Sequence, residues 1–132
     1  INICISVSCS EEIEILTYPS GLYQILTNLI MNSITHAFDE EKDEIENRKI
    51  DILIEKNGNK INLIYKDNGM GIDSESITKI FDPFFTTNRA DGGTGLGLNI
   101  VYNTIKTVFK GSISCTSELN HGTQFNIELE IN

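Results

Sequence analysis

The stretch FDPFFTTNRADGGTGLGLNIV, residues 81–101, decides how this chain is interpreted. It opens with the aromatic residues Phe81, Phe84 and Phe85 and leads through closely spaced glycines into an apolar-periodic segment. Backbone N–H groups are free where a glycine segment enters a helix, and the helix dipole there favours negative charge. We therefore predict a phosphate-binding lid, and we expect residues 86–94 to be the most mobile part of the ligand-free fold.

The glycine motif alone does not identify the ligand. A GxGxxG dinucleotide fingerprint that starts at Gly93 needs a third glycine at position 98, which is Leu98, and no strand leads directly into it. A P-loop needs a lysine directly after Gly97, and that position is again Leu98. For this segment taken alone, a flexible structural linker stays an alternative.

Composition and charge set the class of protein. A chain of 132 residues with 39% hydrophobic and 22% charged residues predicts a single globular domain spanning residues 1–132. No apolar run reaches the ~20 residues of a membrane span and no signal peptide opens the chain, so we expect no membrane contact. The formal net charge of −9 argues against a nucleic-acid partner. An anionic ligand therefore needs backbone donors or a metal ion.

The three cysteines, Cys4, Cys9 and Cys115, are odd in number and show no CxxC spacing. We expect them to be small hydrophobic residues, buried or at a sheet edge, in a reducing compartment.

Hydrophobic periodicity predicts an alternation of strands and helices. Steps of three and four residues predict amphipathic helices at 22–37 and 98–109. We expect Ser20 to cap the first of them, and Ser74 to cap a short helix at 74–80. The acidic segment 38–48 is expected to be a solvated connector. Alternating apolar residues predict strands, the first of them half-buried, at 1–7, 12–16, 50–54, 61–65, 112–119 and 125–131.

One face of the first predicted helix carries amides. Gln24, Asn28, Asn32 and His36 follow one another at four-residue steps. A solvated face is the simplest explanation, but such faces usually carry Lys and Glu, whereas Asn is a poor helix former. We therefore favour a functional role for this polar face.

The segment DNGMGI, residues 67–72, follows the strand predicted at 61–65. A hairpin turn is disfavoured because a helix is predicted next, and an EF-hand loop fits poorly because Gly69 occupies a ligand position. We predict instead a ligand contact at a strand end. A buried aspartate such as Asp67 can accept a hydrogen bond from an exocyclic amine, and the glycines would let the backbone approach a flat ring.

Four sequence elements occur in a fixed order: NLIMN, DNGMGI, FDPFFTT and GGTGLGL, followed by a late GTQF. They resemble the N, G1, F and G2 boxes of the ATP-binding catalytic domain of sensor histidine kinases. This fold is shared with gyrase, mismatch-repair ATPases and heat-shock chaperone ATPases. The resemblance covers nearly the whole chain. It implies an α+β fold, a two-layer α/β sandwich with a mixed, mostly antiparallel sheet and the helices on one face.

The resemblance implies ATP and Mg²⁺ as cofactors. Asn32 would coordinate Mg²⁺, Asn28 would line the phosphates and Asp67 would accept the adenine amine. Phe81, Phe84 and Phe85 would anchor the lid. The remaining nucleotide contacts that the resemblance implies are Gly69, Gly71, Ile72, Phe81, Thr86, Thr87, Gly93, Thr94, Gly95, Leu96, Gly97, Leu98 and Thr123.

Three positions depart from the pattern of the family. Thr35, followed by His36, stands where the family often has a lysine, and Asn88, followed by Arg89, stands where the lid often has one. We expect Arg89 to supply a catalytic cation at the γ-phosphate, beside the catalytic Asn28 and Asn32. For His36, a phosphate contact and a locally hydrogen-bonded surface histidine both stay open. Asn120 replaces the first glycine of the late box, and asparagine also adopts positive φ.

Position 28 separates two classes of enzyme within the resemblance. The hydrolysing relatives carry a glutamate four residues before the magnesium asparagine, and this glutamate activates water. Here the residue is Asn28, and an amide cannot act as a general base near pH 7. The resemblance therefore implies transfer of the γ-phosphoryl group to a histidine rather than rapid hydrolysis.

In sensor kinases that histidine lies on a dimerisation domain of the same or a partner chain, with a response regulator downstream. Neither His36 nor His121 lies in such a context. We expect a cytoplasmic location, and the membrane anchoring of a parent protein stays open. The alternatives are an ATPase or serine kinase of the same superfamily, and a non-catalytic nucleotide-binding module.

Overall fold

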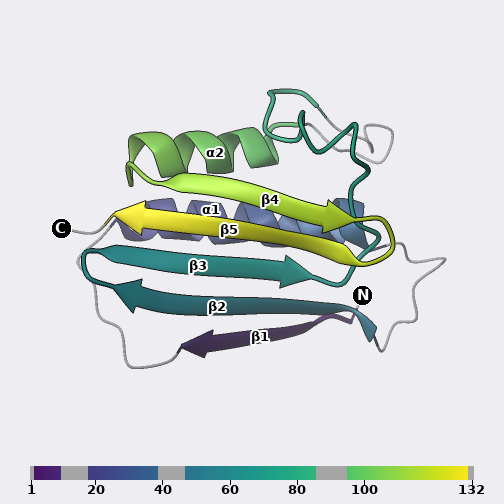
Figure 1. Cartoon of the computed structure of the whole chain (residues 1–132), viewed down its shortest axis with the longest axis horizontal. Helices are drawn as coiled ribbons and strands as arrows, with labels where there is room; N and C mark the ends of the chain where they lie inside the picture. The colour runs from purple at the N-terminus through teal and green to yellow at the C-terminus, as the bar shows by residue number, and fades with distance from the viewer. Residues whose placement is uncertain (1, 10–17, 39–46, 86–94, 131–132) are drawn as a thin grey trace.

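The structure, a computed structural model, describes residues 2–9, 18–38, 47–85 and 95–130 (Figure 1). Its elements are β1 (Cys4–Cys9), α1 (Pro19–Asn32), the π-helical turn η1 (Ser33–Ala37), β2 (Lys49–Asn57), β3 (Lys60–Asp67), α2 (Gly97–Thr107), β4 (Ser112–Glu118) and β5 (Gly122–Glu130).

The strands form one sheet in the order β1-β2-β3-β5-β4. Strand β1 runs parallel to β2, and the other neighbouring pairs are antiparallel. Both helices lie on the same face of the sheet (Figure 1). The predicted two-layer α+β sandwich with a mixed, mostly antiparallel sheet is therefore confirmed.

The core lies between the two helices and the inner face of the sheet. The helices contribute Ile25, Leu29, Val101 and Ile105, each fully buried, and the central strands contribute Tyr65 and Phe125 among others. Burial of each such side chain stabilises the fold by roughly 1.5–3 kcal/mol. The core thus fixes α1 against the ends of β3 and β5. No helix in the described ranges is long and apolar enough to cross a membrane.

The prediction that the first strand is half-buried was wrong. Ile5 and Val7 are 47% and 64% exposed, although they pair with the buried Ile50 and Ile52 of β2. The physical reason is position: β1 is an edge strand, and the helices lie toward the β4 edge of the sheet (Figure 1). The predicted strand at 12–16 and most of the acidic connector lie outside the described residues.

Both predicted serine caps were wrong. Helix α1 begins at Pro19 after an extended Tyr18, without a side-chain cap, because proline needs no N–H partner at the first helical position. Residues 74–80 form a series of turns rather than a helix. Asp73 caps them instead, since its Oδ1 accepts a 2.7 Å hydrogen bond from the amide of Ser76. Cys4, Cys9 and Cys115 form no disulfide with one another and lie on the edge strands β1 and β4.

Candidate functional site

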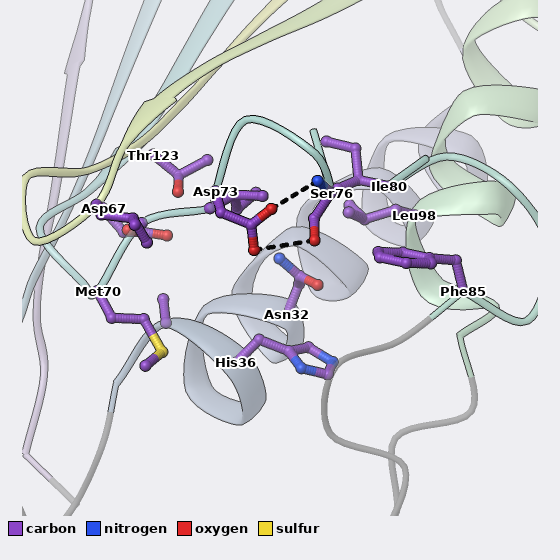
Figure 2. A pocket seen from close by; sticks show the side chains of 14 residues that line it. Asn32, His36, Asp67, Met70, Asp73, Ser76, Ile80, Phe85, Leu98 and Thr123 are labelled. Atoms are coloured by element: carbon purple, nitrogen blue, oxygen red, sulfur yellow. Dashed lines mark hydrogen bonds between the residues drawn. The ribbon is translucent and has the colours of Figure 1, made fainter. Parts of the chain in front are cut away.

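Two adjoining cavities open between the helices and the ends of the central strands. The first, of about 240 Å³, extends from Asp67, Met70 and Thr123 to Phe85 and Leu98. The second, of about 370 Å³, lies between α1 and the start of α2. Both cavities are lined by Asn32, His36, Ile80, Phe85 and Leu98. In Figure 2, Asn32 and His36 rise from the helix between the Asp67 end and the Phe85 end.

Asp67 ends strand β3 and is only 2% exposed. Its Oδ1 accepts a 3.0 Å hydrogen bond from the amide of Gly69, and its Oδ2 accepts a 2.9 Å bond from the hydroxyl of Ser33. Burial raises the pKa of this carboxyl, and hydrogen bonds from Gly69, Ser33 and the backbone of Thr123 oppose that shift. Asp67 is thus a rigid, buried group with access to the first cavity, as base recognition requires.

The loop after Asp67 is held on both sides by backbone. A Cβ atom at Gly69 would lie 2.4 Å from the carbonyl oxygen of Ala37, and one at Gly71, where φ is +77°, would lie 2.2 Å from that of Glu118. The amide of Ile72 donates a 2.7 Å hydrogen bond to Ser117 Oγ. Asn120, with φ of 67°, donates its amide to the carbonyl of Met70. The expectation of positive φ at Asn120 is confirmed.

The amide face of α1 divides between two roles. Gln24 accepts a hydrogen bond from Thr104 of α2 and so serves helix packing. Asn28 donates a 2.8 Å bond to the carbonyl of Gln24 and lines only the second cavity. Asn32 and His36 line both cavities. Of the polar face predicted from the sequence, the last three residues therefore line the cavities, and Gln24 does not.

His36 lies in the π-helical turn η1, which closes with a bond from the amide of Phe38 to the carbonyl of Ser33. Such turns often occur at functional sites. His36 Nδ1 is buried without a hydrogen-bond partner among the described residues. Burial also lowers the pKa of this side chain, so that its neutral form is favoured. The structure shows no local partner for Nδ1, and a bound ligand would supply one.

The aromatic residues at 81–85 have different surroundings. Phe81 packs against Tyr102 and Phe125, with ring centroids 5.6 Å and 6.3 Å away, and Phe85 lines both cavities. Phe84 is 61% exposed and has φ of 68°. Its amide donates a 2.8 Å bond to the carbonyl of Gly95, so its backbone joins the two segments.

The glycines before α2 also differ from one another. At Gly95, with φ of +73°, a Cβ atom would lie 2.3 Å from the carbonyl carbon of Phe84. At Gly97 it would meet only Asn28 Oδ1, at 3.4 Å, so the close approach to another part of the chain occurs at Gly95. Helix α2 begins after Leu96 without a side-chain cap. Its first amides are therefore available to an anion beside the second cavity.

Several predicted contacts lie outside the described residues. These are Thr86, Thr87, Arg89, Gly93 and Thr94, and the expected mobility of 86–94 falls on the same segment.

Sequence reasoning missed some cavity-lining residues. Met70 lay within the DNGMGI segment without a role of its own. Asp73 and Ser76 were missed because Ser74 was predicted to be the cap. Aspartate is itself a preferred capping residue, so Asp73 was an alternative signal. The other lining residues that were not assigned to the site are Ala37, Ile80 and Leu119 in the first cavity, and Met31, Thr35 and Ile100 in the second.

The charge around the cavities indicates what an anionic ligand would need. The described residues that line them include Asp67 and Asp73 but no lysine or arginine. Within the described residues no cluster of three His, Cys, Asp or Glu side chains could hold a metal alone. Mg²⁺ keeps several waters when it binds to a protein, so a single protein oxygen can suffice as its ligand. Asn32 offers such an oxygen.

Comparisons with known proteins agree with this geometry. A family model described as histidine kinase-, DNA gyrase B- and HSP90-like ATPase matches residues 17–132. The sensor histidine kinase YvrG of Bacillus subtilis (strain 168) is 35% identical over 92% of this chain and 20% of its own length. The sensor histidine kinase ZraS of Escherichia coli (strain K12) is 31% identical over 90% of this chain and 23% of its own length. The chain thus spans about a fifth of these curated relatives.

A solved structure of a histidine kinase domain is also similar to this chain. The nucleotide-free catalytic domain of histidine kinase ThkA has a TM-score of 0.79 and 31% sequence identity, over 98% of this chain and 80% of that one. The chain therefore belongs to the family of histidine kinase-, DNA gyrase B- and HSP90-like ATPases, as an ATP-binding catalytic domain of the sensor histidine kinase type.

Proposed function

We propose that this chain binds Mg-ATP and delivers its γ-phosphoryl group to a histidine on an adjoining dimerisation domain, of the same or a partner chain, with a response regulator downstream. One observation carries the proposal. A cavity with a buried carboxylate, Asp67, continues past Asn32 and His36 into a second cavity at the uncapped start of α2. A base fits the first environment, and a polyphosphate fits the second.

Each residue then has a defined role. Asp67 accepts the adenine amine, and Met70, Ile72 and Ile80 supply apolar contact for the ring. The first amides of α2 bind phosphate oxygens, and His36, whose Nδ1 has no protein partner in the described structure, bonds a ribose or phosphate oxygen. Asn32 would hold Mg²⁺, which would supply neutralisation of the charge on the phosphates. Phosphoryl transfer needs mostly positioning and charge neutralisation.

The chemistry at position 28 favours transfer over hydrolysis. Asn28 Nδ2 is held by the carbonyl of Gln24, and Asn28 Oδ1 faces Gly97. An amide in this position cannot take a proton from water near pH 7. ATP would therefore persist in the site until an acceptor histidine arrives.

Titration calorimetry of the whole chain with ATP, with and without Mg²⁺, tests the proposal. We expect Mg²⁺ to tighten ATP binding in the wild type and to have no such effect in Asn32→Ala. Asn62→Ala, on the open face of the sheet, is the matched control. A second measurement follows transfer of labelled phosphate to a histidine-containing dimerisation domain supplied in trans, with a His→Ala version as control. Absence of Mg-dependent ATP binding would favour a non-catalytic module, and fast turnover by the chain alone would favour an ATPase.

A further inference from the structure

The first cavity holds a second carboxylate, Asp73, for which the proposed function gives no role. Asp73 and Ser76 line this cavity together with Asp67 and Asn32, and neither of them lines the second cavity. Figure 2 shows the Asp73–Ser76 pair between the Asp67 end and the Phe85 end of the cavity, next to Asn32. A nucleotide that runs from Asp67 to the start of α2 passes this pair after its base and before its phosphates. That position belongs to the sugar.

Ser76 holds the Asp73 carboxylate in place. The Ser76 amide donates a 2.7 Å hydrogen bond to Asp73 Oδ1, and the Ser76 hydroxyl donates a 3.1 Å bond to Asp73 Oδ2. The Ile77 amide donates a 3.1 Å bond to the carbonyl of Asp73 and so fixes the backbone of the same turn. The two bonds from Ser76 also lower the pKa of Asp73, so this carboxyl is ionised at neutral pH.

An ionised Asp73 can only accept hydrogen bonds. A carboxylate offers about four acceptor positions and no donor. Ser76 and the neighbouring backbone fill part of this capacity, and the side chain is exposed, so the rest is open to a ligand. The group that binds to Asp73 must therefore be a donor.

A cap does not require a carboxylate at position 73. Serine and asparagine cap a turn about as well as aspartate does. The described residues that line the two cavities already include Asp67 and contain no lysine or arginine, so a second negative charge disfavours a triphosphate. Hydrogen-bond donors on the ligand would offset that cost.

An adenine nucleotide has few such donors. They are the amine of the base, which is assigned to Asp67, and the 2′- and 3′-hydroxyls of the ribose. Acidic side chains accept hydrogen bonds from ribose hydroxyls in dinucleotide-binding folds. We propose that Asp73 is a specificity-determining residue that accepts hydrogen bonds from the ribose hydroxyls, so that the site favours ribonucleotides over deoxyribonucleotides. This inference rests on the proposed nucleotide binding.

Asp73→Ser is the variant that separates this role from capping. The serine hydroxyl can still accept the bond from the Ser76 amide, so the turn should form. The shorter, uncharged side chain cannot reach the sugar. Glu75→Gln is the matched control, because it removes the same charge from the same turn, and Glu75 is exposed and lines neither cavity.

The experiment measures the dissociation constants of Mg-ATP, Mg-2′-deoxyATP and Mg-3′-deoxyATP by calorimetry at pH 7. The three nucleotides carry the same triphosphate, so the effect of a changed protein charge on the phosphates cancels in the ratios of their affinities. For the wild type we expect each deoxynucleotide to bind about three- to tenfold more weakly than ATP, the equivalent of one hydrogen bond. Asp73→Ser should bind all three equally well, and Glu75→Gln should keep the ratios of the wild type.

A role in capping alone would lower the melting temperature of Asp73→Ser and weaken all three nucleotides equally, with the ratios of the wild type retained. That result would overturn the inference, and so would a wild type that binds the three nucleotides with the same affinity. A wild type that binds none of them would instead refute the proposed function, so the two failures are distinguishable.

Discussion

The amide nitrogen of Met70 donates a 2.8 Å hydrogen bond to the carbonyl oxygen of Ala37, the last residue of the π-helical turn η1. This bond joins the loop after Asp67 to the helix that carries Asn32 and His36. Gly69 makes the approach possible, because any side chain there would meet the Ala37 backbone. A backbone hydrogen bond therefore holds together the two ends of the site at which we propose that the base and the phosphates bind.

Substitution of Gly69 by alanine should separate these two elements. A Cβ atom would lie 2.4 Å from a backbone oxygen that cannot rotate away. We expect a loss of about 1–3 kcal/mol in the free energy of unfolding, measured by urea denaturation, together with loss of ATP binding. Gly58→Ala is the control, because a Cβ atom there meets nothing within 4 Å. Its positive φ should cost about 1–2 kcal/mol, but ATP binding should be unchanged. Normal ATP affinity in Gly69→Ala would contradict the role of this contact.

Asp67→Asn should change both the pH dependence of stability and the affinity for ATP. Burial raises the pKa of Asp67 in the folded state, so between its ordinary value and the raised value the folded protein binds more protons than the unfolded one. The associated stability is present at low pH and is lost as the pH rises through the raised pKa. The asparagine variant lacks this loss, so its stability relative to wild type should increase from pH 4 to pH 7.

The same variant should bind ATP about tenfold more weakly or worse, because a charged acceptor for the adenine amine is lost. Thermal unfolding at several pH values and calorimetry at pH 7 measure the two effects. Asp51→Asn, at an exposed position of β2, is the control. An Asp67→Asn variant with wild-type ATP affinity would show that the base binds elsewhere.

His36 should make the protein less stable in mild acid. Burial lowers the pKa of His36 in the folded state, so just below pH 6.5 the unfolded chain gains a proton that the folded chain does not. The stability that His36 contributes is present above pH 6.5 and is lost as the pH falls through the lowered pKa. We expect the stability difference between wild type and His36→Gln to change between pH 7 and pH 5. His121→Gln, at an exposed position, should follow the wild type.

The helices and most of the sheet were predictable because they depend on local pattern. The apolar period from Leu22 to Ala37 located the first helix, and alternation located β3 and β5. The order of the sequence boxes placed Asn32 and Asp67 in one site, and both line the first cavity, while their roles as ligand contacts stay predictions. What depends on tertiary neighbours was not predictable. The helical spacing of apolar residues continues unchanged through η1, so it did not predict the π-helical turn. The last residue of this turn, Ala37, accepts the backbone hydrogen bond from Met70.

The hydrogen bond between the hydroxyls of Ser33 and Tyr65 was not predictable either. The alternation of apolar residues assigned Tyr65 to the core but gave no partner for its hydroxyl. The exposure of Ile5 and Val7 depends on how far the helices extend across the sheet, which no strand pattern contains. At the start of α1, the sequence suggested Ser20 as a cap, but the helix begins at Pro19 without a side-chain cap. In each of these places a distant contact or a backbone constraint prevailed over a local signal.

Asn28→Glu should turn the site toward ATP hydrolysis. Asn28 lies at the second cavity with its Oδ1 toward Gly97 at the start of α2, where the phosphates are proposed to bind. A carboxylate there can accept a proton from water, and general-base catalysis contributes up to about 10²–10⁴-fold. We expect steady-state phosphate release by the chain alone to rise at least tenfold over wild type, even if ATP binds more weakly to the added charge. Asn28→Gln is the matched control, because it has the same length without a base. Equal turnover in the two variants would show that water cannot reach the γ-phosphate from this side chain, and the preference for transfer would then need another cause.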